Sequence, residues 1–141
     1  MTTAIALIDG NNFYASCEQM IDPSLVGNPL VILSNNDGCI ISRNSEAREL
    51  NIPMGAPYFK IRPQLESLGV NVRSSNYSLY GDISSRLMAL IKSNCEELEI
   101  YSIDEAFVKL ARPIGHNLYS WGQELRSLAH RNLGIPIAIG I

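Results

Sequence analysis

Three carboxylates have the type and the spacing for chemistry. Asp9 directly follows the continuous apolar run of residues 4–8, and Asp104 and Glu105 are adjacent within YSIDEAF, residues 101–107. Carboxylates that converge in a partly dry cleft repel one another, and a divalent cation removes the repulsion. Oxygen ligands without Cys or His suit Mg²⁺ or Mn²⁺, and two such ions about 4 Å apart are the usual apparatus for in-line phosphoryl displacement. The alternative is a helix-capping aspartate and a solvated hairpin turn.

The elements that must position these acids follow a strand–helix–strand–strand–helix–strand order, once residues 11–77 are set aside. The apolar run predicts a buried central strand. The remaining predicted elements are an amphipathic helix over 78–94, strands over 98–102 and 106–110, a second amphipathic helix from 118 to about 134, and a strand over 136–141. This is the ferredoxin-like split βαβ pattern, an α+β fold with an antiparallel sheet ordered 4-1-3-2. The end of strand 1 then lies beside the start of strand 3, which brings Asp9 to Asp104 and Glu105.

Residues 11–77 predict a small α/β insertion after the first strand. Asn35-Asn36-Asp37-Gly38 indicates a hairpin turn, because Asp-Gly readily adopts positive φ. Proline and glycine mark the loops between the predicted elements. These elements are helices over 13–20, 44–50 and 58–67 and strands over 30–33, 39–42 and 70–73, and Asn11 or Asn12 is the expected cap of the first helix.

Composition limits the function classes. Among 141 residues, 11 Lys and Arg against 14 Asp and Glu give a net charge of −3, which excludes a basic nucleic-acid grip over the whole surface. No apolar run is long enough for a membrane span, and the first residues do not resemble a secretory signal. Cys17, Cys39 and Cys95 fit neither a disulfide framework nor a zinc pattern, so we expect buried thiols in a reducing cytoplasm.

Five sequence words carry a resemblance to a known family. They are DGNNFYASCE at 9–18, LSNNDGC at 33–39, RNSEAR at 43–48, SSNY at 74–77 and YSIDEAF at 101–107. In these words, and in their order, the sequence resembles the Y-family translesion DNA polymerases, most closely the UmuC-type catalytic subunit of the bacterial SOS response to DNA damage. The resemblance implies a DNA-directed DNA polymerase, in which two Mg²⁺ ions, or Mn²⁺, assist attack of a primer 3′-hydroxyl on a deoxynucleoside triphosphate.

The resemblance also implies residue roles. Asp9, Asp104 and Glu105 match the catalytic metal-binding carboxylates, and the Gly10 carbonyl matches a further metal contact. Tyr14 matches the steric gate against ribonucleotides, and Arg48 matches a residue that meets the triphosphate. The alternatives are a core aromatic for Tyr14 and a solvated helix face for Arg48. The other residues implied are Asn11, Asn12, Phe13 and Ser45 for nucleotide binding, and Ile32, Ile40 and Ile41 as a loose cover over the nascent base pair.

The implied organisation is a palm at 1–17 and 78–141, fingers at 18–77, and no thumb or little-finger domain. Template–primer DNA and nucleotide are the implied partners, with no membrane; a UmuD-type activator subunit and a sliding clamp would bind through the missing part. Ser45 departs from the Tyr of many Y-family members, as the UmuC-type branch does. Without the missing domains, the 1–141 chain alone is expected to be inactive.

Two other functions stay open at this point. A PIN-like metal-dependent nuclease also begins with an apolar strand and Ile-Asp-Gly-x-Asn, but it needs further acids at the ends of parallel strands. A truncated remnant that binds nucleotide or a partner without turnover is the other alternative. His116 and His130 are interpreted as structural, because neither has a second candidate ligand nearby in the sequence.

Overall fold

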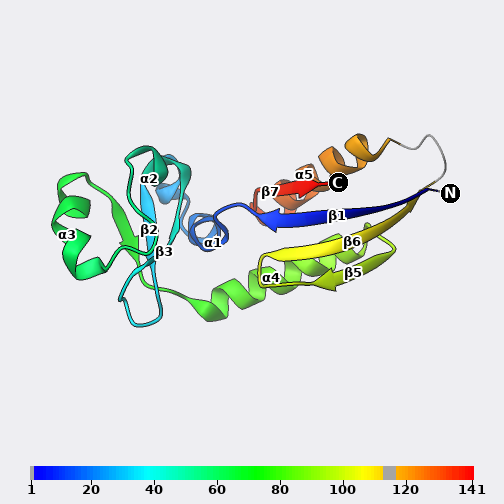
Figure 1. Ribbon diagram of the computed structural model, residues 1–141. Coiled ribbons are helices and arrows are strands. Elements are labelled where there is room, and N and C mark those ends of the chain that lie inside the picture. The colour runs from blue at the N-terminus through cyan, green and yellow to red at the C-terminus, as the bar shows by residue number, and fades with distance from the viewer. Residues whose placement is uncertain (1, 113–116) are drawn as a thin grey trace. The chain divides into compact units, whose positions relative to one another are not determined.

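The computed structural model describes residues 2–112 and 117–141, and the chain folds into two compact units (Figure 1). The first unit combines Met1–Asn11 with Ser78–Ile141, and the second is Asn12–Tyr77. None of the helices within the described residues has the length and apolar character needed to cross a bilayer.

The first unit has the predicted order of elements. The first strand is longer than the apolar run of residues 4–8, because the residues on either side of that run also pair in the sheet. The elements are β1 (Thr2–Gly10), α4 (Tyr77–Lys92, which starts one residue before the unit's boundary), β5 (Glu97–Ile100), β6 (Glu105–Arg112), α5 (Leu118–Leu133) and β7 (Ile137–Gly140).

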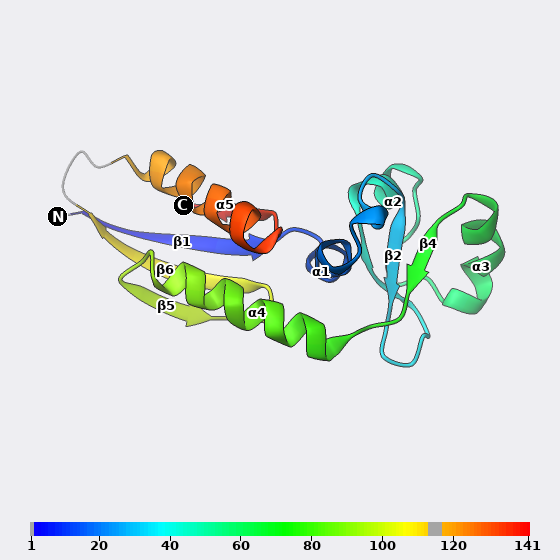
Figure 2. The same ribbon diagram turned by 180° about the vertical axis from the view of Figure 1, so that it is seen from behind.

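The sheet of the first unit is ordered β5-β6-β1-β7, which confirms the predicted 4-1-3-2 arrangement. Every neighbouring pair is antiparallel, so the doubly wound parallel sheet of a PIN-like nuclease is excluded. Helices α4 and α5 cover one face of the sheet (Figure 2). The side chains of β1 alternate accordingly: Ala6 and Ile8 are buried beneath the helices, while Ile5 and Leu7 are exposed on the open face.

The second unit is an α/β insertion with a three-stranded sheet ordered β3-β2-β4. Strand β2 pairs antiparallel with β3 and parallel with β4. A 3₁₀ turn at Pro23–Leu25 follows the first helix and was not predicted. The elements are α1 (Phe13–Ile21), β2 (Leu30–Leu33), β3 (Ile40–Arg43), α2 (Ser45–Glu49), α3 (Tyr58–Ser67) and β4 (Asn71–Arg73).

An apolar core of its own holds the second unit together. It is built from β2, β3, α2 and α3, and its buried members are Val31, Leu33, Ile40, Ala47, Ile52, Ile61 and Leu65. Asn44 joins these elements by hydrogen bonds. Its Oδ1 accepts from the backbone N–H groups of Leu30 and Ala47, each at 3.0 Å, and its Nδ2 donates to the Asn28 carbonyl at 2.7 Å. One amide side chain therefore caps α2 and fixes the start of β2.

Three details differ from the sequence expectations. The first compact unit ends at Asn11 and the second begins at Asn12, whereas the predicted palm extends to residue 17; the palm and fingers division stays a prediction. Asn12 occupies the N-cap position of α1, but it has left-handed backbone (φ 46°) and its side chain makes no capping bond. Cys17 is buried as expected, whereas Cys39 and Cys95 are only half-buried; none of the three forms a disulfide.

Candidate active site

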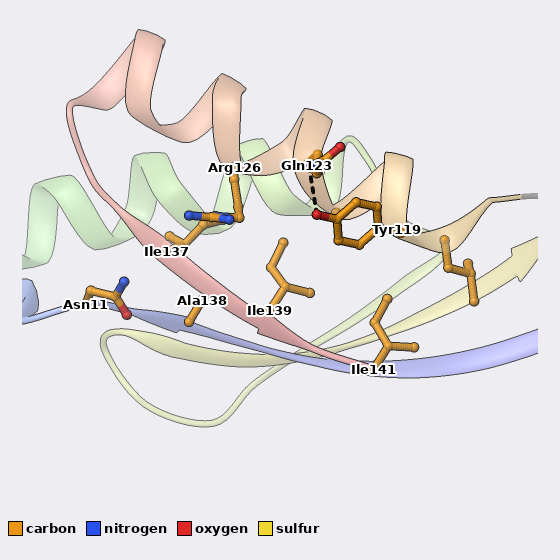
Figure 3. A pocket seen from close by; sticks show the side chains of 10 residues that line it. Asn11, Tyr119, Gln123, Arg126, Ile137, Ala138, Ile139 and Ile141 are labelled. Atoms are coloured by element: carbon orange, nitrogen blue, oxygen red, sulfur yellow. Dashed lines mark hydrogen bonds between the residues drawn. The ribbon is translucent and has the colours of Figure 1, made fainter.

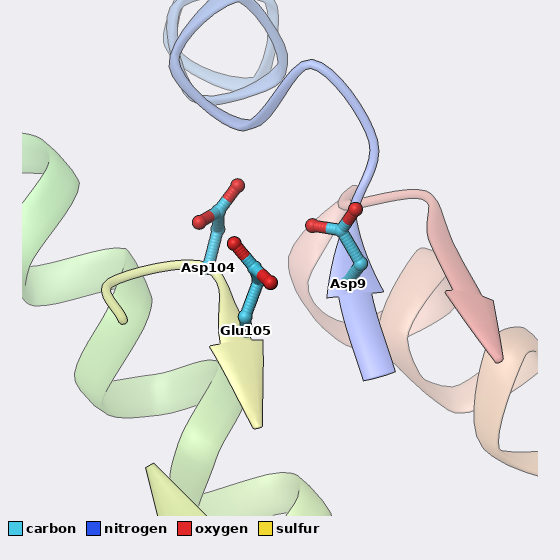
Figure 4. Close-up of side chains that lie close together, drawn as sticks. All are labelled: Asp9, Asp104 and Glu105. Atoms are coloured by element: carbon cyan, nitrogen blue, oxygen red, sulfur yellow. The ribbon is translucent and has the colours of Figure 1, made fainter. Parts of the chain in front are cut away.

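Three carboxylates converge at one end of the first unit's sheet. Asp9 in β1 lies directly opposite Glu105 in β6 in the antiparallel register, and Asp104 immediately precedes β6. One carboxylate oxygen from each residue lies within 4.8 Å of the other two, and all three side chains are half-buried. Figure 4 shows the three carboxyl groups turned toward one another, Asp9 from β1, Glu105 from the start of β6 and Asp104 from the turn before it. The predicted convergence is confirmed.

A tight turn between β5 and β6 presents Asp104 and Glu105. The Tyr101 and Ser102 N–H groups donate to the Glu105 carbonyl at 3.0 and 3.1 Å, and the Gly10 N–H donates to the Asp104 carbonyl at 2.8 Å. The Ser102 hydroxyl donates to Asp104 Oδ1 at 3.1 Å and lies 3.4 Å from Glu105 Oε1. Ser102 is not among the site residues predicted from the sequence. Its position in the sequence could have indicated this bond, because a serine two residues before adjacent acids in a hairpin turn can donate its hydroxyl to them.

The electrostatics of this cluster suit a cation. Burial, the negative charges of Asp104 and Glu105, and a side-chain hydrogen bond with Asp104 raise the pKa of Asp9 above its ordinary 3.8. No ion pair among the described residues includes any of the three acids. The donor set is all oxygen, as hard divalent cations prefer. The residues therefore fit a magnesium-type ion, which would offset their mutual repulsion.

Two aromatic residues predicted to bind nucleotide lie on the first turn of α1. Phe13 is 3% exposed, so its side chain belongs to the core of the second unit and only its backbone remains for a ligand. Tyr14 is half-buried and packs edge-on against Tyr77, with ring centroids 6.2 Å apart. Its steric-gate role stays a prediction.

The polar residues predicted to bind nucleotide gather partly around α2. Ser45 and Arg48 are exposed on this helix. With its amide oriented to satisfy both neighbours, Asn12 accepts a hydrogen bond from Arg48 Nη2 at 3.1 Å and donates to the Arg43 carbonyl at 3.0 Å. The structure thus brings Asn12 and Arg48 together. Arg43 was not predicted; its Nη1 donates to the Ile52 carbonyl at 2.7 Å, which indicates a structural role.

The three isoleucines predicted to cover a base pair differ in burial. Ile32 is 0% and Ile40 1% exposed, so both are core residues of the second unit. Ile41 is half-buried. The base-pair cover stays a prediction; of the three side chains, that of Ile41 has the most exposed surface to offer a ligand.

Asn11 lines a cavity of about 330 Å³ between β7 and α5. Figure 3 shows Asn11 at one end of it, with Arg126 and Gln123 on α5 and the isoleucines of β7 along its floor. Its predicted nucleotide contact stays a prediction. His130 is exposed on α5, and His116 lies outside the described residues.

Comparison with known proteins supplies the family. Residues 8–141 match the impB/mucB/samB family. The chain belongs to this family. It is 44% identical to the protein named UmuC of Salmonella typhimurium over 137 residues, which is 96% of this chain and 32% of that protein. It is 28% identical to DNA polymerase IV of Saccharolobus solfataricus, over 97% of this chain and 40% of that protein.

Solved structures share the fold of this impB/mucB/samB chain. The crystal structure of DinB from Sulfolobus solfataricus superposes with a TM-score of 0.85 at 23% identity, over 99% of this chain and 41% of that one. An insertion ternary complex of Dbh DNA polymerase gives the same TM-score and identity. The α+β fold with its antiparallel sheet is thus confirmed. The chain spans about a third of the length of the first curated relatives it matches.

Proposed function

We propose that this chain is the catalytic N-terminal portion of a Y-family translesion DNA polymerase, which transfers a nucleotide from a deoxynucleoside triphosphate to a primer 3′-hydroxyl. The observation that carries the proposal is the Asp9–Asp104–Glu105 cluster, with its oxygens within 4.8 Å of one another, in a chain of the impB/mucB/samB family. Convergent carboxylates that take part in no ion pair among the described residues are suited to phosphoryl transfer through divalent cations.

Asp9, Asp104, Glu105 and the Gly10 carbonyl would hold the metal, for which we propose Mg²⁺, with Mn²⁺ as a substitute. Bound there, the metal supplies positive charge that activates the attacking hydroxyl and stabilises the leaving pyrophosphate. The protein's part is to fix the carboxylates before the substrates arrive. The hydrogen bonds within the turn before β6 support this, because they limit the freedom of both adjacent acids.

The second unit would bind the nucleotide. In this proposal the Arg48 guanidinium compensates triphosphate charge, and Asn12 supports it through the hydrogen bond to Nη2. The Tyr14 ring excludes a 2′-hydroxyl, and Ser45 and the backbone of Phe13 add polar contacts. Asn11, which belongs to the first unit, adds a further polar contact. Ile41 faces the nascent base pair.

Partners and location follow from the same proposal. Template–primer DNA is the substrate, and three cysteines without a disulfide agree with action in the reducing cytoplasm. A UmuD-type activator subunit and a sliding clamp would bind parts of a longer protein, since this chain spans about a third of the length of the first curated relatives it matches.

A chimera tests the function. The chain replaces the matching segment of DNA polymerase IV of Saccharolobus solfataricus, which is 28% identical to it, and primer extension is measured with Mg²⁺ and four deoxynucleotides. We expect extension by the chimera and none by its Asp104→Asn variant, because the cluster would then lack one metal-binding charge. The unaltered relative is the positive control.

Two results would count against the proposal. A folded chimera that binds template–primer but does not extend it, while the relative does, would favour the inactive remnant. Extension that survives Asp104→Asn would remove the acidic cluster from the chemistry.

A further inference from the structure

Ser84 interrupts the apolar face by which α4 packs on the sheet. The other buried residues of that face are Tyr80, Ile83, Leu87, Met88 and Ile91. Ser84 is only 9% exposed, and burying a hydroxyl costs free energy unless it finds a hydrogen-bond partner. A serine within a helix commonly bonds a carbonyl of the preceding turn.

The partner of Ser84 lies instead in the turn that carries the acidic cluster. The Ser84 hydroxyl donates to the backbone carbonyl of Ile103. Ile103 lies between β5 and β6, and this carbonyl has no other hydrogen bond among those found in the described residues. The bond therefore ties the turn to a rigid helix of 16 residues.

This bond and a second one fix the backbone on both sides of Asp104. The peptide group before Asp104 is held through the Ile103 carbonyl by α4. The peptide group after it is held through the Asp104 carbonyl, which accepts from the Gly10 N–H at 2.8 Å. With both peptide planes oriented, the direction of the Cα–Cβ bond of Asp104 is set. Ser102 then restrains the carboxylate itself.

We propose that Ser84 is a positioning residue for the acidic cluster: through the Ile103 carbonyl it holds the 101–104 turn in the conformation that aims Asp104 at Asp9 and Glu105. Ser84 touches neither substrate nor metal. The proposal rests on the proposed function in one respect, that the cluster binds a divalent cation. The effect of Ser84 on the turn without metal does not depend on that function.

The experiment compares Ser84→Ala with Ser85→Ala in the 1–141 chain. Ser85 is the next residue on α4 and is exposed, so the same change there is a matched control. Mn²⁺ affinity is measured by electron paramagnetic resonance, and backbone hydrogen exchange is measured by NMR without metal. We expect Ser84→Ala to weaken Mn²⁺ binding about tenfold, as loss of an outer-shell partner of a metal site commonly does. We also expect faster exchange of the Gly10, Tyr101 and Ser102 amides.

The readouts separate positioning from packing. General destabilisation would speed exchange across the whole sheet, including its centre at Ala6 and Val108, and would leave the Mn²⁺ affinity of folded molecules unchanged; that pattern would overturn the proposal. Unchanged exchange at the turn in Ser84→Ala would overturn it as well. If Ser84→Ala does not fold, Ser84→Cys keeps a similar size with a weaker donor and should shift both readouts the same way. A wild-type chain that binds no Mn²⁺ would refute the metal site, while exchange would still decide the role of Ser84.

Discussion

At the scale of single residues, the acidic cluster combines a stabilising strand pairing with destabilising repulsion between carboxylates. Pairing β1 with β6 stabilises the sheet, but the same register sets Asp9 opposite Glu105. The raised pKa of Asp9 is the physical sign of that conflict, since burial and two negative neighbours disfavour its ionised form. Native proteins retain such local conflict mainly at functional sites. The cost to stability is itself measurable.

Asp9→Asn should stabilise the metal-free chain at neutral pH by a few degrees in melting temperature. The folded protein holds the Asp9 proton to higher pH than the unfolded chain does. The stability that Asp9 contributes is therefore fully present below its ordinary pKa of 3.8 and is lost as the pH rises through the raised value. The gain from Asp9→Asn should accordingly vanish below 3.8, as measured by thermal unfolding across pH.

Added Mg²⁺ should make the wild-type chain more stable than Asp9→Asn, the reverse of the order without metal. At ten times its dissociation constant a ligand stabilises the folded state by about 1.4 kcal/mol, and only the chain with Asp9 should gain it. Asp82→Asn, which removes an exposed carboxylate paired with Arg86, is the control. Equal stabilisation of wild type and Asp9→Asn by Mg²⁺ would contradict a metal site at the cluster.

Tyr14→Ala should relax sugar selection in the extending chimera. If the Tyr14 ring occupies the space of a 2′-hydroxyl, its removal should raise ribonucleotide incorporation relative to deoxynucleotide incorporation about tenfold, or roughly 1.4 kcal/mol of discrimination. Kinetics of single-nucleotide insertion measure both. Tyr119→Ala, an exposed tyrosine on α5, is the control. Equal losses for both sugars would make Tyr14 a packing residue alongside Tyr77.

At the scale of elements, hydrogen bonds from single side chains join segments that are distant in sequence. Asn44 is the clearest case in the second unit, because its amide bonds to three backbone groups while only 3% exposed. Removing it would leave two buried N–H groups and one carbonyl without their partner. An unsatisfied buried group costs about 1–3 kcal/mol.

Asn44→Ala should therefore lower the free energy of unfolding by about 2–4 kcal/mol. Asn44→Asp keeps the acceptor for the Leu30 and Ala47 amides but sets a carboxylate oxygen against the Asn28 carbonyl, so its loss should be smaller at acid pH, where a protonated carboxyl can donate to that carbonyl, than at neutral pH. Urea titration measures both, and Ser45→Ala on the exposed side of α2 serves as the control. A loss no larger for Asn44→Ala than for Ser45→Ala would mean that Asn44 is dispensable.

The fold was largely predictable because its elements follow hydrophobic period and turn chemistry. The run before Asp9, the three- and four-residue steps of α4 and α5, and Gly134 with left-handed backbone at the end of α5 all set elements close to their predicted bounds. The strand ends then placed Asp9 beside Glu105. What the sequence could not indicate depends on contacts across long separations. The bond from Ser84 to Ile103 spans 19 positions, and burial of Ile32 and Ile40 depends on how the second unit's layers pack.

At the scale of the whole molecule, charge and length set what the chain can do alone. Its net charge is −3, and it spans about a third of its curated relatives. Affinity for DNA comes mainly from Lys and Arg contacts to phosphates. Among the described residues several of these cations are already paired with acids, including Arg62, Arg86 and Lys109. With acids outnumbering Lys and Arg by 14 to 11, the chain as a whole offers a DNA duplex no net positive charge.

We therefore expect the 1–141 chain to fold, to bind Mg²⁺ weakly and to show no processive DNA synthesis. Its affinity for duplex DNA at physiological salt should be weaker than the roughly 10⁻⁴–10⁻⁶ M of dedicated non-specific binders, with a shallow salt dependence. A primer 3′-hydroxyl would then not be held beside the cluster. Synthesis would be slow, because such proximity can lower the activation barrier by about 7–11 kcal/mol. Primer extension and a salt titration of DNA binding measure these expectations. Robust extension by the wild-type chain that is lost in Asp104→Ala would mean that the two units suffice to hold the primer.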